Sequence, residues 1–97
     1  MRIMMKIKIP VEKGNQAFAD GSMQKAFEQL MERLKPEASY FYMEDGLRAA
    51  TLICNVDEEY RFFEAHEPMF AALNALIDET PVLTWEDMAT GFKDMTG

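Results

Sequence analysis

The sequence ASYFYMEDGLRAATLICNV, residues 38–56, decides the fold of this chain. Aromatic and β-branched residues, which are typical of β-strands, lie on both sides of Asp45-Gly46. An Asp-Gly pair between two strand-like runs is the strongest short-range indication of a hairpin with a two-residue turn. The sequence therefore predicts two antiparallel strands, over residues 38–43 and 47–56.

The predicted turn also fixes which hairpin residues share a face. Tyr42 lies opposite Ala49 and Tyr40 lies opposite Thr51, and side chains alternate between the two faces of a strand. One face then carries Tyr40, Tyr42, Ala49, Thr51 and Ile53, and the other carries Phe41, Met43, Ala50, Leu52, Cys54 and Val56. Both faces are largely apolar, so we expect both to be covered.

The segments before the hairpin predict one strand and one helix. Residues 4–9 alternate between apolar and mostly cationic positions, which indicates a strand that ends at Pro10. We expect a loop over residues 14–21. Apolar residues then recur at helical spacing over residues 23–34, and Pro36 ends that helix.

The segments after the hairpin predict a helix, a strand and a short helix. Residues 57–73 have helical periodicity, with a break or kink expected near Glu67 because Pro68 follows. A short strand lies within residues 75–83, and a last helix covers residues 85–92.

Three of the predicted helix starts carry side chains suited to capping. Asp20 or Ser22 can cap the first helix and Asp57 the second. Thr84 and Asp87 resemble a capping box at the third.

The predicted order is β-α-β-β-α-β with an additional C-terminal helix. This order defines the ferredoxin-like fold of the α+β class, in which both long helices cover one face of a four-stranded antiparallel sheet. The 97 residues fit a single domain, residues 1–97.

Composition narrows the classes of function. A formal net charge of −7 and the lack of a run of Lys and Arg argue against a nucleic-acid partner. No segment approaches the roughly 20 apolar residues that span a membrane. The single cysteine, Cys54, excludes an internal disulfide. We expect a cytoplasmic protein with no membrane partner and an inert, buried thiol.

Short sequence elements in most parts of the chain resemble the dimeric α/β-barrel superfamily, and within it a small, uncharacterised bacterial family. These elements are Met5–Val11, Gly14-Asn15, Asp20–Ser22, Lys35–Ala38, Glu44–Gly46, Glu67-Pro68 and Leu73–Ala75. The superfamily includes cofactor-free monooxygenases, lactone isomerases and haem-degrading enzymes. The resemblance implies a pocket for a small apolar or amphipathic molecule between sheet and helices. We expect it to be lined by Phe41, Phe62, His66, Met69 and Phe70.

The open face of the predicted sheet indicates a second copy of the chain. Helices cover only one face of such a sheet, and a face left to water is normally polar. Here two tyrosines and further apolar residues lie on that face, which is typical of an interface. A two-fold homodimer covers it most simply, and its expected interface residues are Lys6, Lys8, Tyr40, Tyr42 and Thr51.

His66, the only histidine, has two interpretations. In the functional interpretation it is the general base of a cofactor-free monooxygenase or isomerase, or an axial metal ligand. In the structural interpretation it is a core residue bonded to backbone carbonyls or Tyr60. A lone histidine argues against zinc, and we expect no metal and no cofactor. Whether the chain is an enzyme stays open, and a structural or regulatory dimer without ligand is the third alternative.

Lys6 and Lys8 lie on the predicted open face and also have two interpretations. They bind an anionic ligand inside a paired barrel, or they form salt bridges with acids of the same sheet, such as Asp78 or Glu79.

Overall fold

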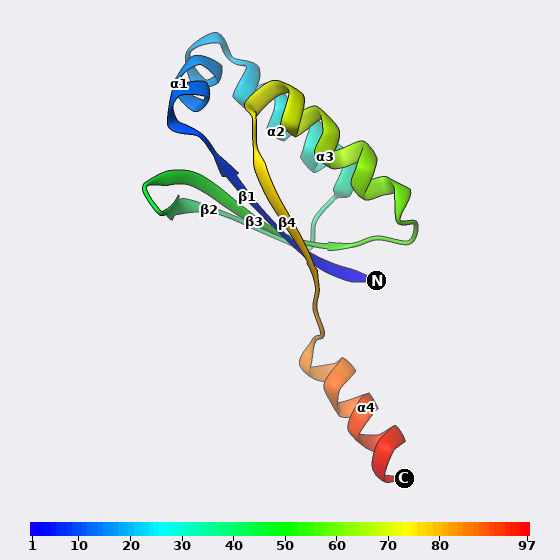
Figure 1. Cartoon of the computed structure of the whole chain (residues 1–97). Helices are drawn as coiled ribbons and strands as arrows, with labels where there is room; N and C mark the ends of the chain where they lie inside the picture. The colour runs from blue at the N-terminus through cyan, green and yellow to red at the C-terminus, as the bar shows by residue number, and fades with distance from the viewer.

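The computed structural model describes residues 1–97 and contains four strands and four helices. In chain order these are β1 (Arg2–Ile9), α1 (Val11–Asp20), α2 (Ser22–Leu34), β2 (Ala38–Glu44), β3 (Leu47–Asn55), α3 (Tyr60–Leu73), β4 (Leu76–Pro81) and α4 (Trp85–Thr96). The strands form one sheet in the order β2-β3-β1-β4, and every neighbouring pair is antiparallel. Helices α2 and α3 lie across one face of this sheet (Figure 1). The chain therefore has the predicted ferredoxin-like fold.

The β2–β3 hairpin has the predicted turn and register. Tyr42 pairs with Ala49 and Tyr40 with Thr51. Asp45 and Gly46 both have positive φ angles, 54° and 75°, as a type I′ turn requires. This local geometry determines which hairpin side chains face the helices.

The hydrophobic core lies between the sheet and helices α2 and α3. Alternate residues of β1 are buried, because the strand turns one face toward the helices. The fully buried side chains with the largest volumes are Met5, Ile7, Ile9, Leu30, Leu52, Met69, Leu73 and Cys54. The core is confined to the helix side of the central strands, so edge strands β2 and β4 are less covered.

The predicted loop over residues 14–21 is wrong, because most of it belongs to helix α1. Pro10, with φ of −56°, precedes the helix, and the Gly14 amide donates to the Pro10 carbonyl. Ala17 is buried, which stabilises the helix, and Gly21 in the left-handed region ends it. Gly21 occupies the position before α2 and has no side chain to cap it. The prediction for Asp20 is confirmed in part, because Asp20 Oδ1 accepts a hydrogen bond of 2.8 Å from the Ser22 amide, the first amide of the helix.

Two predictions about α3 are also wrong. Asp57 does not cap the helix, which begins at Tyr60; its first amides bond to the carbonyls of Glu58 and Glu59. The helix does not break near Glu67 but continues through Pro68 to Leu73. Buried side chains on both sides of the proline, Ala65, Met69 and Leu73, compensate for the missing amide hydrogen bond.

Helix α4 projects from the end of β4 and leaves the body of the molecule (Figure 1). Its capping box between Thr84 and Asp87 is present as predicted, and no residue of the helix is buried. The radius of gyration is 15.6 Å, whereas about 12–13 Å is typical for a chain of this length. The projecting helix explains this excess. None of the four helices has the length and apolar character needed to cross a membrane.

Candidate functional site

An apolar groove of about 310 Å³ lies between the sheet and helices α1 and α2, on the side of the β2–β3 hairpin. Of its eight lining residues, seven are hydrophobic: Ile9, Phe18, Met23, Phe27, Phe41, Tyr42 and Ala49. The eighth is Arg48. Such a size is at the lower end of the range for small-molecule pockets.

The walls of the groove come from residues whose positions the fold sets. Phe41 of β2 and Phe27 of α2 pack edge to face, with ring centroids 5.5 Å apart. Phe41 is still 59% exposed and Phe18 is 73% exposed, because α2 and α3 lie over the central strands and leave β2 at the edge. The groove therefore offers aromatic surface that the chain itself does not cover.

Arg48 enters the groove from β3 and contacts α1. Its Nη2 donates a hydrogen bond of 3.0 Å to Asn15 Oδ1, and its guanidinium carbon lies 6.0 Å from the centroid of the Phe18 ring. A Cβ atom at Gly14 would lie 2.6 Å from Arg48 Nη1. Glycine at this position therefore allows the guanidinium to lie against the helix backbone.

The residues predicted to bind a ligand lie in two different places. Phe41 lines the groove beside β2, while His66 and Phe70 lie beside β4, at the opposite edge of the sheet. Met69 is fully buried and Phe62 packs against the core. The predicted set does not surround one common pocket.

His66 forms a hydrogen-bonded pair with Glu79. The distance from His66 Nδ1 to Glu79 Oε1 is 2.7 Å, and both side chains are mostly buried, at 22% and 23% exposure. The rings of Phe70 and Phe63 lie 5.1 and 6.0 Å from the imidazole. On the solvent side, His66 Nε2 lies 3.4 Å from a Glu67 carboxylate oxygen. The imidazole thus bonds to a carboxylate, and not to backbone carbonyls or Tyr60 as one interpretation had it.

The two lysines of the open face form ion pairs with acids of the hairpin. Lys6 Nζ lies 3.2 Å from Glu44, and Lys8 Nζ lies 3.1 Å from Glu44 and 3.0 Å from Asp45. Hydrogen bonds from Lys8 and then Lys6 lower the pKa of Glu44, and those from Lys8 to Asp45 and Glu44 raise the pKa of Lys8. The predicted partner Asp78 takes no part in these ion pairs.

Glu79, the other predicted partner, faces the helices. It directly follows Asp78 in β4, so its side chain lies on the opposite face of the strand. The salt bridges therefore form across β3 to the hairpin and not to β4.

The open face carries the tyrosines expected at an interface. Tyr40 is 64% exposed, and the Tyr42 hydroxyl bonds to Thr51. Leu76 of β4 lies on the same face, since it pairs with Lys8, and it is also exposed.

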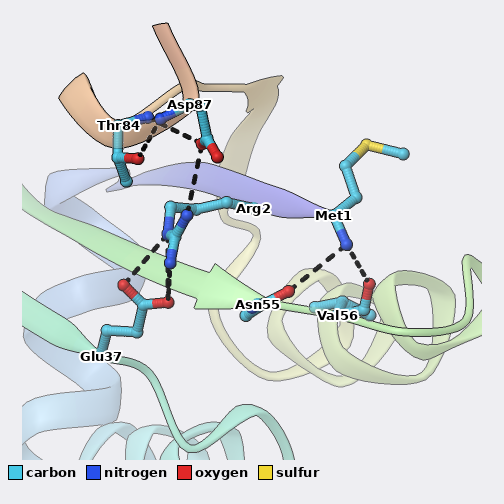
Figure 2. A network of polar contacts seen from close by, with 7 residues as sticks. All are labelled: Met1, Arg2, Glu37, Asn55, Val56, Thr84 and Asp87. Atoms are coloured by element: carbon cyan, nitrogen blue, oxygen red, sulfur yellow. Dashed lines mark hydrogen bonds and ion pairs between the residues drawn. The ribbon is translucent and has the colours of Figure 1, made fainter. Parts of the chain in front are cut away.

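Arg2 connects the start of β1 to the start of α4. Figure 2 shows its guanidinium between Glu37, at 3.0 Å, and Asp87, at 3.5 Å. The hydrogen bond to Glu37 raises the pKa of Arg2. Hydrogen bonds from the Thr84 backbone and side chain lower the pKa of Asp87. This network orients α4 at its base.

Two other chemistries have little support from the described residues. Burial raises the pKa of the Cys54 thiol to about 11, so the thiolate nucleophile is scarce at neutral pH. No group of three or more His, Cys, Asp or Glu side chains is arranged to hold a metal ion.

Sequence reasoning missed Arg48, Gly14 and the aromatic residues of α1 and α2 in the groove. A signal was present: Arg48 is the only charged residue on the helix-facing side of an otherwise apolar strand.

No protein-family model and no curated protein sequence matches the chain. Among solved structures, a de novo designed protein called Ferredog-Diesel is similar, with 13% sequence identity and a TM-score of 0.48. The alignment covers 84% of this chain and 85% of the design.

Proposed function

We propose that the chain is a cytoplasmic homodimer in which each subunit binds a small apolar or amphipathic molecule between sheet and helices. The observation that carries the proposal is the groove beside β2, whose lining is apolar except for Arg48. Aromatic side chains left open to water on a concave surface favour a ligand, because burying them is stabilising.

The support for a dimer comes first from the open face of the sheet. Tyr40 and Leu76 are 64% and 58% exposed there, because no helix of the same chain lies over that face (Figure 1). A second copy of the same face buries these side chains with two-fold symmetry. The predicted interface residues Lys6, Lys8, Tyr42 and Thr51 share this surface with them.

The projecting helix α4 adds independent support. Trp85, Met88, Phe92 and Met95 recur at helical spacing and are all exposed, so the helix has an apolar stripe without a partner in its own chain. We propose that this stripe packs on the second copy. The resulting assembly is of the dimeric α/β-barrel type. It would place the chain in the superfamily that its sequence resembles, and within it in the small bacterial family.

Titration with 1-octanol, followed by two-dimensional amide NMR, tests the ligand proposal. We expect chemical-shift changes concentrated at the groove, and weaker binding by Phe41→Ala. Phe63→Ala is the matched control, because Phe63 is similarly exposed, at 64% against 59%, but lies on α3 outside the groove. Scattered or absent shifts in the wild type would leave the structural or regulatory dimer without ligand.

The His66–Glu79 pair supports a second candidate function, a cofactor-free monooxygenase or isomerase. A carboxylate bonded to one imidazole nitrogen orients the ring and stabilises its protonated form, as a general base requires. Here Glu79 is bonded to Nδ1. Nε2, which lies 3.4 Å from a carboxylate oxygen of the half-exposed Glu67, is the nitrogen that would take a substrate proton, and Glu67 would have to move aside for the substrate.

Turnover of aromatic or lactone substrates by wild type and by His66→Ala tests this candidate. We expect turnover to be lost in His66→Ala and reduced in Glu79→Gln, with the wild-type fold retained by circular dichroism. Equal turnover by His66→Ala and wild type would remove His66 from the chemistry.

A further inference from the structure

Arg48 is the one charged side chain in the apolar groove, and its ion-pairing differs from that of the other cations of the sheet. The strands carry Arg2, Lys6, Lys8 and Arg48. The first three each form at least one ion pair with a carboxylate, and Arg48 forms none. This is notable in a chain with 17 acidic and 10 basic residues.

Most of the hydrogen-bonding capacity of Arg48 is unused. A guanidinium has five N–H donors, and the bond to Asn15 Oδ1 is the one that this side chain makes. The residue that carries the remaining donors lines a groove whose other lining residues are hydrophobic. A planar guanidinium binds a carboxylate through two parallel hydrogen bonds.

The position of the guanidinium is constrained by three residues of α1. Asn15 accepts its hydrogen bond, the Phe18 ring lies 6.0 Å from its central carbon, and Gly14 leaves room for Nη1. Glycine within a helix costs about 1 kcal/mol relative to alanine, and the contact with Arg48 explains its presence here. The cation is thus held against α1 by the side chains and backbone of that helix.

We infer that the groove recognises an amphipathic carboxylic acid, with the carboxylate bound by Arg48 and a short aliphatic or aromatic tail packed between Phe27 and Phe41. This inference rests on the proposed function, and it specifies the ligand class. The tail contributes burial of apolar surface, and Arg48 distinguishes the acid from a neutral molecule of the same shape.

Octanoate and 1-octanol, two probes with equal chain length, test the inference by isothermal titration calorimetry on the full chain at pH 7. We expect wild type to bind octanoate at least about 10-fold more tightly than 1-octanol. Arg48→Met keeps the aliphatic stem and removes the charge, and it should abolish this preference while leaving 1-octanol affinity within about 2-fold.

Gly14→Ala provides a second variant that keeps the charge of Arg48. The new methyl group would lie 2.6 Å from Nη1 and 3.3 Å from Ile9 Cγ2, so the larger displacement falls on the guanidinium. We expect octanoate affinity to fall about 3-fold or more and 1-octanol affinity to change less. Asn15→Ala, which removes the neutral partner without steric conflict, should have a smaller effect than Gly14→Ala.

The outcomes separate failure of this inference from failure of the proposed function. Equal affinity for octanoate and 1-octanol in wild type overturns the role of Arg48 but leaves the apolar site intact. Octanoate binding that persists in Phe41→Ala with unchanged affinity also overturns it, because the anion then binds outside the groove. A third outcome is that neither probe binds wild type but both bind a variant with Trp85 and Phe92 replaced. Helix α4 of a second copy then fills the groove, and both the proposed ligand site and its recognition of a carboxylate are overturned.

Discussion

Replacing two aromatic residues of α4 by serine, Trp85→Ser with Phe92→Ser, should weaken the homodimer. Trp85 is 72% exposed and Phe92 is 52% exposed in the single chain. If each aromatic side chain has about 150–250 Å² of surface, these exposed fractions correspond to roughly 190–310 Å² of apolar surface on each α4. At about 25 cal/mol per Å², burial of that surface contributes about 5–8 kcal/mol before the costs of association.

If about a third of this free energy survives those costs for each of the two copies of α4, the double variant loses about 3–5 kcal/mol and should raise the dissociation constant of the dimer at least 100-fold. Sedimentation velocity over a dilution series measures that constant directly. The matched control is Thr90→Ser with Asp94→Asn, on the polar side of the same helix, which should leave it within about 3-fold. A dissociation constant equal to that of wild type in the aromatic variant would refute the packing of α4 on a second copy.

Three further predictions concern stability and reactivity. Hydrogen bonds from Lys8 and Lys6 lower the pKa of Glu44. The stability that they contribute is present above the ordinary carboxyl pKa of about 4.3 and is lost as pH falls through the lowered value. The melting temperature of Glu44→Gln should therefore fall less than that of wild type between pH 6 and pH 3, and parallel curves of melting temperature against pH would contradict this. Gly46→Ala places a side chain at φ of 75° with no atom within 4 Å, so urea unfolding should show a loss of about 1–2 kcal/mol from backbone strain alone, and an unchanged midpoint would count against the turn. The pKa of Cys54 is raised to about 11, so a thiol reagent at pH 8 should label it only at the rate of unfolding, and labelling within seconds would show that the thiol is accessible.

Local signals in the sequence predicted the parts of the fold that depend on neighbouring residues. The Asp45-Gly46 turn fixed the hairpin register, and the alternation along residues 4–9 identified the buried face of β1. The capping box at Thr84 was also predictable, because both of its bonds join residues three positions apart. In each case the deciding residues are close together in the sequence.

The features that were missed depend on residues far apart in the chain. Lys6 pairs with Glu44, 38 positions away, and His66 with Glu79, 13 positions away. Helix α1 was taken for a loop because Gly14 is a poor helix residue, and the reason for that glycine, the contact with Arg48, is visible only when β3 lies beside α1. The apolar stripe of α4 was visible in the sequence, but its distance from the body of the chain was not.

The mass of the wild-type protein in solution, measured by multi-angle light scattering over a range of concentrations, tests the homodimer most directly. Our account predicts twice the chain mass of 11.2 kDa at micromolar concentration. A mass of 11.2 kDa that persists at the highest concentration would leave Tyr40 and the apolar stripe of α4 in contact with water, and it would contradict the account.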